Sequence, residues 1–428
     1  MGHLAAAAGI SGLIKTVLSI YYSEIPAHLN FNKPNPHINW ANLPINIVTK
    51  TCPWTVNNEK IKSAVVSSFG ASGTNASVIL SEPPQDQTLI PKISPILITL
   101  SAKDPERLRI FAAELVANLE QKPDWNINDI AFSLNTGRFP HKHRLSLLVS
   151  SLDSLREGLE IFLSSNWEEN QKQVIYGEAQ SNPKIAFLCN DQGEILPRMG
   201  EDLFINEPVF HDAFIKCDRL FQNHLKFSLE DLFYKNQAPD SEHNPLSVQP
   251  ILFAFHYALC ELWKSWGICP SAVLGSGLGE YLAAQQTGIF SLEDAVKLVA
   301  GRARFLSQKL DQKELVAFQK IAEEITYHHP QLTLIANGEL ANNSLTNSAY
   351  WGQPIQESKQ VAKGITTLHQ MGYQIFLEIG TYPNLINIGR QKLAENSILW
   401  LSSLVKDCHS NQQMQIVLGE TVYPRSKY

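Results

Sequence analysis

The sequence is poor in the features that mark a metal site, a disulfide-rich fold or a nucleic-acid binder. Its six cysteines form no Cys-x-x-Cys pair and are scattered along the chain, at positions 52, 189, 217, 260, 269 and 408. Structural zinc sites and disulfide scaffolds need paired, closely spaced ligands, so we expect free thiols in the cytoplasm and no bound metal. The 35 basic and 41 acidic residues give a formal charge of −6 without a basic run. This balance argues against nucleic acid as a partner.

Long uncharged apolar runs are also missing. The N-terminal stretch GHLAAAAGISGLIKTVLSIYY is apolar, but it has no basic segment at its start and Lys15 interrupts it. It therefore falls short of the ~18 to 20 uncharged residues that a membrane-spanning helix requires. We expect a buried core helix over residues 4–22 and no membrane partner. The chain does have 44% hydrophobic residues over 428 positions, which suits two or three domains with real cores.

Hydrophobic periodicity predicts strands and helices that alternate along most of the chain. Strands are predicted over residues 64–69, 76–80, 95–99, 144–150, 184–190, 271–275, 332–337 and 375–380. Helices are predicted over residues 104–119, 127–134, 151–163, 207–223, 247–266, 281 onward and 356–371. Alternation of this kind predicts an α/β fold in which helices cover the faces of a parallel sheet.

Several segments carry a resemblance to one family. GHLAAAAGISGLIKTVL, EIPAHLNFNKPNPHINW and SAVVSSFGASGTNASVIL resemble the C-terminal end of a ketosynthase domain from a modular (type I) polyketide synthase. FLCNDQGEILPRMG, the long stretch from QPILFAF to VAGRAR, and IFLEIGTYPNLI resemble the acyltransferase domain that follows it in that family. The segment between them resembles the linker that joins the two domains.

The resemblance implies a domain order. It assigns the C-terminal part of a ketosynthase to residues 1–82, the linker to 83–182, a truncated acyltransferase domain to 183–410 and a C-terminal tail to 411–428. The implied folds are a partial thiolase-like layer, a small α/β linker domain and an α/β-hydrolase-like acyltransferase core. The sequence runs almost directly from the VAGRAR helix into the strand at 332–337. We therefore expect the family's ferredoxin-like subdomain, and the histidine base that follows it, to be absent.

The ketosynthase part lacks the groups that its resemblance would need for chemistry. The family condenses acyl chains with a cysteine nucleophile and two histidines. His3 matches the second histidine, while no cysteine of this chain lies in a matching context. The family motif GGTNAH reads SGTNAS here, so that Ser77 stands in place of a histidine. We expect this part not to condense anything by itself and His3 to be orphaned.

The acyltransferase part lacks its nucleophile. In the family, the motif G-H-S-x-G presents a serine that takes an acyl group from coenzyme A and passes it to a carrier-protein thiol. Here Gly277 occupies the serine position and Ser276 the preceding histidine position. A displacement of about 1 Å already costs ~10²-fold in rate, so we do not expect Ser276 to act instead. The glycine spacing also resembles a dinucleotide fingerprint, but Glu280 stands where its third glycine should and would repel a pyrophosphate.

Two groups in the match could bind without reacting. Gln192 and Gly193 match the loop whose backbone helps form the oxyanion hole. Arg302 matches the arginine that forks onto the free carboxylate of a malonyl-type group, with a structural helix cation as the alternative. No bound cofactor is expected. The substrates implied by the resemblance are malonyl-CoA-type thioesters and the phosphopantetheine arm of a carrier protein.

Three functions follow from these residues. The first is a catalytically inactive piece of a polyketide synthase module, whose family loads malonyl-type groups onto an acyl carrier protein for chain extension. The second is a non-catalytic scaffold or docking subunit, which pairs with a separately encoded N-terminal ketosynthase half or with a carrier protein. The third, an active acyltransferase that uses Ser276 or a base supplied in trans, is the least favoured.

Overall fold

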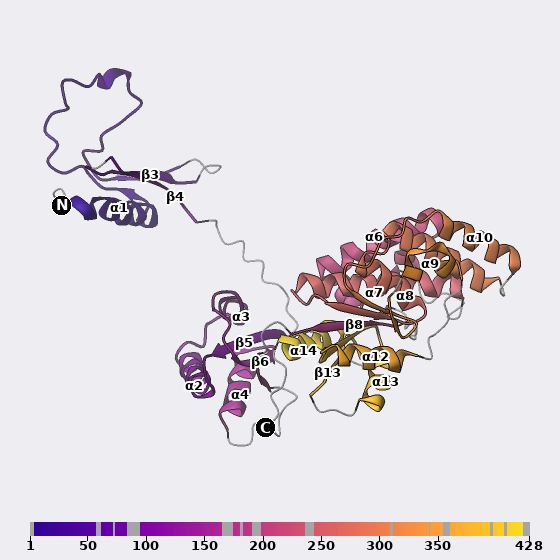
Figure 1. Ribbon diagram of the computed structural model, residues 1–428. Helices are drawn as coiled ribbons and strands as arrows, with labels where there is room; N and C mark the ends of the chain where they lie inside the picture. Colours follow the sequence, from indigo (N-terminus) through magenta and orange to yellow (C-terminus); the bar gives the residue numbers. More distant parts are fainter. Residues whose placement is uncertain are drawn as a thin grey trace. The chain divides into compact units, whose positions relative to one another are not determined.

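The chain divides into two compact units, Met1–Pro91 and Lys92–Tyr428 (Figure 1). The computed structural model describes residues 4–56, 61–71, 73–83, 95–164, 174–179, 183–190, 198–235, 244–308, 311–341, 343–353, 360–393, 397–405 and 409–422. Each unit has its own arrangement of helices and strands.

The first unit is one helix against a β-hairpin. Its main elements are η1 (Ala5–Ala7), α1 (Ala8–Tyr22), β1 (Glu24–Ile25), η2 (Trp40–Asn42), β2 (Cys52–Pro53), β3 (Ser63–Phe69) and β4 (Asn75–Ser81). Strands β3 and β4 pair antiparallel. The helix lies close to one face of the hairpin, because a Cβ added at Gly12 would lie 3.1 Å from Val66 Cγ1 and one at Gly9 would lie 3.2 Å from Ser68 Cβ.

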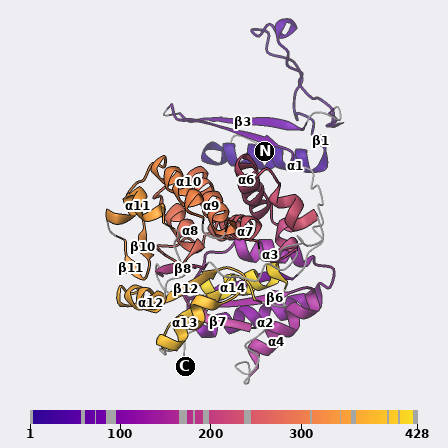
Figure 2. The same ribbon diagram turned by 90° about the vertical axis from the view of Figure 1, so that its right-hand side faces the viewer.

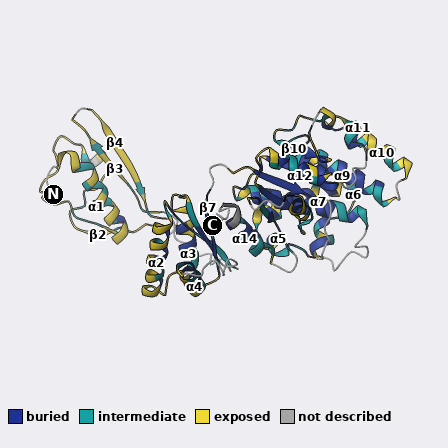
Figure 3. Cartoon of the chain, turned by 60° about the horizontal axis from the view of Figure 1, so that its bottom comes forward, coloured by how far each residue is buried: buried dark blue, intermediate teal, exposed yellow. Residues whose placement is uncertain are grey.

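The predicted helix at 4–22 is present, but the prediction that it is buried is wrong. Ile20 is the only buried residue among the described residues of the first unit. Figure 3 accordingly shows most of this unit in the colour of exposed residues. Among the described helices, the stretch Ala5–Tyr22 is the one that is long and apolar enough to span a membrane, and 6% of it is buried. The sequence pattern indicated apolar faces correctly, but it could not show whether anything covers them.

The second unit begins with a small antiparallel sheet. Its strands are β5 (Ile96–Ala102), β6 (His143–Val149) and β7 (Val174–Glu178), in the order β5-β6-β7. Helices α2 (Pro105–Gln121), α3 (Ile127–Thr136) and α4 (Leu152–Leu163) pack with these strands around a separate hydrophobic core. The other face is covered by α14 (Ser410–Val422), since a Cβ at Gly419 would lie 3.3 Å from Ile175 and Ser146 side chains (Figure 2).

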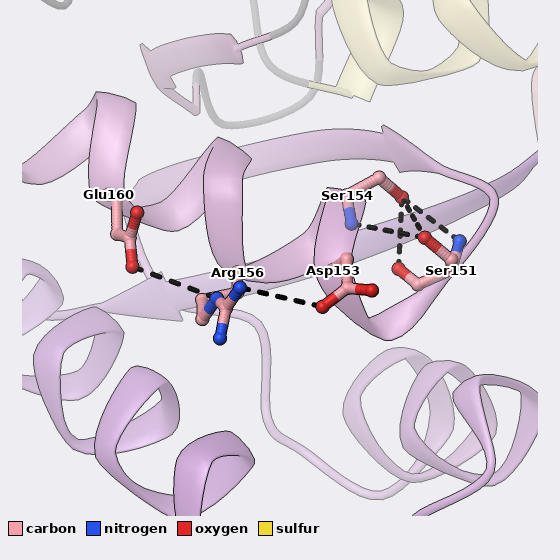
Figure 4. Close-up of polar contacts among 5 residues, drawn as sticks. All are labelled: Ser151, Asp153, Ser154, Arg156 and Glu160. Atoms are coloured by element: carbon pink, nitrogen blue, oxygen red, sulfur yellow. Dashed lines mark hydrogen bonds and ion pairs between the residues drawn. The ribbon is translucent and has the colours of Figure 1, made fainter. Parts of the chain in front are cut away.

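Side-chain caps fix where the helices of this unit begin. Ser151 accepts a hydrogen bond from the Ser154 amide at 3.1 Å, and Ser154 accepts one from the Ser151 amide at 2.9 Å, which closes a capping box at the start of α4 (Figure 4). Arg156 lies on the same helix between Asp153 and Glu160, 3.5 Å and 3.9 Å away. The caps satisfy backbone amides that the helix leaves unpaired, whereas exposed ion pairs of this kind stabilise little.

A larger α/β body follows. Its six-stranded sheet has the order β11-β10-β9-β8-β12-β13, and all strands except β11 run parallel. The strands are β8 (Ile185–Cys189), β9 (Ala272–Gly275), β10 (Thr333–Ala336), β11 (Glu339–Leu340), β12 (Ile375–Ile379) and β13 (Leu399–Ser402). Strands β8 and β12 are buried along their whole length, as expected for strands covered on both faces.

Helices cover both faces of this parallel sheet. They are α5 (Glu201–Asn206), α6 (Pro208–Leu225), α7 (Pro245–Ser265), α8 (Leu278–Thr287), α9 (Leu292–Ser307), α10 (Gln312–Glu323), α11 (Ser348–Trp351), α12 (Val361–Gln370) and α13 (Asn384–Lys392). One hydrophobic core joins the sheet to α6, α7 and α9, and a second joins its other face to α12 and α13. The predicted α/β fold with a covered parallel sheet is confirmed.

The connection from α9 to β10 is short. In the part of residues 308–332 that the structure describes, α10 is the one helix or strand present. A Cβ at Gly301 would lie 2.9 Å from Phe318 Cδ2, so α10 packs closely on α9. In its described residues, the connection thus consists of α10 and the segments that flank it.

Candidate functional site

The site lies at the carboxyl end of the parallel sheet, where β9 ends and α8 begins. Ligands of open parallel sheets bind at this edge, because the loops that follow the strands converge there. Strand β9 ends at Gly275 and α8 starts at Leu278, so two residues make the turn. The amide of Ser276 donates to the carbonyl of Cys189 at the end of β8, 3.0 Å away, and ties the turn to the neighbouring strand.

Gly277 stands at the tip of this turn. Its φ is +56° and its ψ is −120°, a backbone conformation that residues with a side chain rarely adopt. The amides of Gly279 and Glu280 donate to the carbonyls of Ser276 and Gly277 at 2.9 Å and 3.1 Å, and start α8 immediately after the tip. Strand, sharp turn and helix make a nucleophile elbow. Its tip carries no nucleophile.

The elbow is held by close packing. A Cβ at Gly279 would lie 2.1 Å from the carbonyl oxygen of Cys189, a distance that no side chain can occupy. The first turn of α8 therefore presses directly on the end of β8. This contact fixes the direction in which the elbow points.

Ser276 does not lie at the tip of the turn. It is 1% exposed and lies on the strand side of Gly277. The tip of the elbow is the position of the next residue, Gly277. The structure therefore gives no support to nucleophilic attack by Ser276.

Glu280 anchors the elbow helix. Its carboxylate is buried and accepts hydrogen bonds from the amide of Asn337 at 3.0 Å and from the hydroxyl of Tyr350 at 2.5 Å. These contacts join α8 to the turn after β10 and to α11. Burial, with the nearby Glu280 carboxylate as a second cause, raises the pKa of Tyr350, so the phenol stays protonated and remains a donor. Both carboxylate oxygens are thus engaged in structural contacts.

Arg302 is packed between three helices. It is 5% exposed on α9, it donates from Nη1 to the side-chain oxygen of Gln249 on α7, and its guanidinium lies 5.9 Å from the ring centroid of Tyr281 on α8. An amide oxygen and an aromatic face are favourable surroundings for a buried cation. Arg302 was predicted from the sequence, whereas Gln249 was not; the signal for Gln249 was a polar residue near the start of an otherwise apolar helix.

Glu378 and His256 are two further buried polar residues near the same edge of the sheet, and neither was predicted from the sequence. Glu378 on β12 accepts hydrogen bonds from the amides of Leu385 and Ile386 and from the side chain of Asn190, at 2.8–3.0 Å, and so caps the start of α13. Burial raises the pKa of Glu378 to about 7, against the opposing effect of these hydrogen bonds. Its contacts are those of a structural carboxylate.

His256 is a buried histidine on α7. Burial lowers its pKa to about 4, so the ring is neutral near pH 7. Its Nε2 would lie 3.5 Å from a Cβ added at Gly380, and it has no hydrogen-bond partner among the described residues. A histidine within the apolar run ILFAFHYAL was the sequence signal that could have identified it.

The remaining predicted site residues lie outside the described part of the chain. They are His3, Gln192 and Gly193. Within the described residues, no group of three or more histidine, cysteine and acidic side chains could hold a metal ion.

A cavity of about 460 Å³ is lined by charged and polar side chains at the end of α6 and in the segment that follows. One lining carboxylate, Asp218, accepts hydrogen bonds from the amide of Leu229 at 2.5 Å and from the side chains of Ser228 and Gln222. These contacts cap the turn after α6. The hydroxyl of Ser228 donates to Asp218 and accepts from the amide of Asp231, so it serves this turn.

Comparisons with known proteins agree with this geometry. Three family models match the chain in order: "Beta-ketoacyl synthase, C-terminal domain" over residues 1–32, "CurL-like, PKS C-terminal" over 96–159 and "Acyl transferase domain" over 186–339. The solved acyl transferase domain of ZmaA superposes with a TM-score of 0.69 at 22% identity, covering 76% of this chain and 93% of that domain. The acyltransferase domain from module 8 of the salinomycin polyketide synthase superposes with a TM-score of 0.65 at 20% identity, covering 78% and 96%. These likenesses show the fold.

Curated relatives match most of the chain. Erythronolide synthases EryA2 and EryA3 of Saccharopolyspora erythraea are 33% and 34% identical over 72% and 74% of this chain. Mycoketide-CoA synthase of Mycobacterium tuberculosis is 27% identical over 95% of it. The chain spans 9%, 10% and 11% of the lengths of these relatives. The alignment with the last covers 488 residues, more than this whole chain, so that relative has residues with no counterpart here.

Proposed function

Because this chain belongs to the modular type I polyketide synthases and carries an acyltransferase domain of that family, we propose that it takes part in such an assembly without forming an acyl-enzyme itself. The observation that carries this proposal is Gly277, a residue without a side chain at the tip of an intact elbow. Covalent acyl transfer needs an oxygen or sulfur nucleophile at that point. Without it, a bound thioester has no group to attack its carbonyl carbon.

The missing base supports the same proposal. A serine nucleophile depends on a neighbouring base, and the two act as a unit, so that losing either one removes most of the rate advantage. Within its described residues, the short connection through α10 has no element besides this helix that could correspond to the subdomain after which the family's histidine is expected. We infer that both the nucleophile and the base are absent from this acyltransferase.

The retained groups favour binding as the remaining role. The buried cationic side chain of Arg302 lies beside α8, and the backbone turn of the elbow is present at Gly277. In the family these positions face a malonyl-type thioester. We propose that any interaction of this chain with such a thioester is non-covalent.

The test is acylation of the full chain. The purified protein is incubated with malonyl-CoA and then examined by intact-mass spectrometry, with an active acyltransferase domain as the positive control. We expect no covalent adduct on this chain and a stoichiometric adduct on the control. A matched Ser276→Ala variant identifies the alternative, because an adduct that forms on the wild type and disappears in this variant would mean that Ser276 is a nucleophile.

A second function, docking or scaffolding, is favoured by the first unit. Ile20 is its only buried residue among those described, so it has almost no core of its own. We propose a partner in the cytoplasm that covers this unit, either a separately encoded ketosynthase half or an acyl carrier protein. Titration of an isotope-labelled carrier protein with this chain distinguishes them: a ketosynthase partner predicts no shifts in the carrier-protein spectrum.

A further inference from the structure

His256 has a buried ring nitrogen that no group of the described fold uses. The side chain is 1% exposed and lies on α7, within a run of apolar residues. Its Nε2 has no hydrogen-bond partner among the described residues. Buried polar atoms are nearly always hydrogen-bonded, to protein or to ordered water, because an unmade hydrogen bond costs free energy. Nε2 therefore marks a place where a small molecule from outside the chain can bind.

The space in front of this nitrogen has about the size of one methyl group. A Cβ built at Gly380, just after β12, would lie 3.5 Å from Nε2 and 3.8 Å from Cε1 of His256, and 4.0 Å from Nδ2 of Asn190. Apart from the chain neighbours of Gly380, no other described atom is printed nearer to that point. These are ordinary contact distances. One heavy atom therefore fits there without a clash.

The groups around this space are polar and closed to solvent. Asn190 is 1% exposed, and its Nδ2 donates to Glu378 at 3.0 Å and to the carbonyl of Tyr382 at 3.5 Å. Thr381, which follows Gly380, has a buried hydroxyl that also has no partner among the described residues. Apolar spaces in proteins stay dry, whereas polar ones of this size hold water.

We propose that the turn after β12 holds one water molecule, which is hydrogen-bonded to Nε2 of His256 and joins α7 to the ends of β8 and β12. The ring is neutral near pH 7, so Nε2 accepts from this water or donates to it according to its tautomer. Strand β8 lies next to β9, at whose end the elbow begins. The water thus supports the edge of the sheet on which the candidate site lies. This inference goes beyond the proposed function and does not depend on it.

Other occupants fit this space less well. A metal ion needs several ligands, and the described residues contain no group of three or more histidine, cysteine and acidic side chains that could hold one. An acyl chain is too large for a closed space that one Cβ would fill. An ammonium ion has a suitable size, but it would carry a charge into a buried place, which costs far more than burying a neutral water.

A crystal structure of the full chain tests the proposal directly. Crystals of the wild type and of Gly380→Ala are grown near pH 7 without ammonium salts. We expect one water about 2.7–3.2 Å from Nε2 of His256 in the wild type and none in the variant, because the added Cβ takes its place. An empty space in the wild type, a protein group bonded to Nε2, or a metal ion at this point would each overturn the proposal.

A double-mutant cycle tests the same water in solution. Gly380→Ala should raise the equilibrium constant for unfolding about tenfold more in the wild type than in a His256→Leu background, because only the wild type is left with an unpaired Nε2. The effect of replacing glycine by alanine on the unfolded chain is the same in both backgrounds and cancels. Urea unfolding of the four proteins measures the difference.

Equal effects of Gly380→Ala in the two backgrounds would contradict the proposal. If a variant does not fold, the wild-type crystal structure decides alone. Neither measurement involves Gly277 or a thioester. A failure here therefore leaves the proposal about acyl transfer standing, and an acyl adduct leaves the water site standing.

Discussion

At the scale of single residues, Gly277 shows that the backbone of an elbow can form without a side chain at its tip. The turn is held by the Gly279 contact with Cys189, by the amide of Ser276 and by the buried Glu280. None of these contacts requires a side chain at position 277. Packing therefore determines the geometry of the elbow, and this geometry does not depend on a catalytic side chain.

Restoring a serine should not restore activity by itself. Gly277→Ser places a side chain at φ +56° and ψ −120°, which costs about 1–3 kcal/mol of the free energy of unfolding. Gly277→Ala should cost about the same, because the strain comes from the Cβ. Urea unfolding checks both values. We expect no acyl adduct on either variant, and an adduct on Gly277→Ser would show that a base is present after all.

His256 should make the protein sensitive to acid. Its folded-state pKa of about 4 lies below the ordinary value of 6.5, so the unfolded chain takes up this proton first as the pH falls. The stability it contributes is present above pH 6.5 and is lost toward pH 4, by about 2–3 kcal/mol. Glu378 changes stability in the opposite direction, since its raised pKa favours the folded state at low pH.

The measurement is a difference between two proteins. Between pH 7 and pH 4.5, the stability of His256→Gln should rise relative to that of the wild type: its free energy of unfolding minus that of the wild type should increase by about 2–3 kcal/mol. The contribution of Glu378 cancels in this comparison. A pH-independent difference would mean that His256 does not stay neutral in the folded state.

At the scale of elements, local sequence signals determined where helices begin, and distant contacts determined what covers them. Asp104, Ser151 and Ser291 each accept a backbone hydrogen bond at a helix start, so the predicted helices at 104–119 and 151–163 lie within two residues of α2 and α4. The bare outer face of α1 depends on contacts that no local pattern contains.

Two strands and one helix escaped prediction. Strands β7 and β13 were not predicted although they are as long as the predicted strands β8 and β9, and the helix α14 lies in a segment assigned to a tail. In the site, the motif predicted the positions of Gly277 and Arg302, because sequence spacing fixes the order of residues along the elbow and helix. The contacts of Gln249, Glu378 and His256 come from packing between segments far apart in the chain.

The capping box of α4 gives a prediction at this scale. Ser151→Ala removes the acceptor for the Ser154 amide and should lower the free energy of unfolding by about 1 kcal/mol. Ser150→Ala is the matched control, because Ser150 contributes its backbone amide and not its side chain to this network. Equal urea midpoints for the two variants would show that the box does not stabilise the helix.

At the scale of the whole molecule, stability is divided unequally between the two units. The second unit contains three hydrophobic cores, whereas the first buries one side chain among its described residues. Burying one aliphatic side chain contributes about 1.5–3 kcal/mol, far less than the conformational entropy lost by ordering a helix and a hairpin.

Hydrogen exchange of the chain alone should reveal this inequality. Amides of β3 and β4 should exchange at least a hundredfold faster than those of β8 and β12, which lie at the centre of the parallel sheet. Mass spectrometry of peptic fragments measures both in one experiment. Similar rates in the two hairpin strands and the central strands would mean that the first unit is stabilised by contacts within the free protein.

The position of α14 matters to anyone who would move this acyltransferase into another synthase. The helix starts on the larger body, where the amide of Asn411 donates to Asp202, and it ends against Ile175 and Ser146 of the small sheet. A graft whose junction lies at residue 405 would omit α14 and would leave one face of the β5-β6-β7 sheet uncovered. A junction beyond residue 422 would keep both halves of the transplanted piece intact.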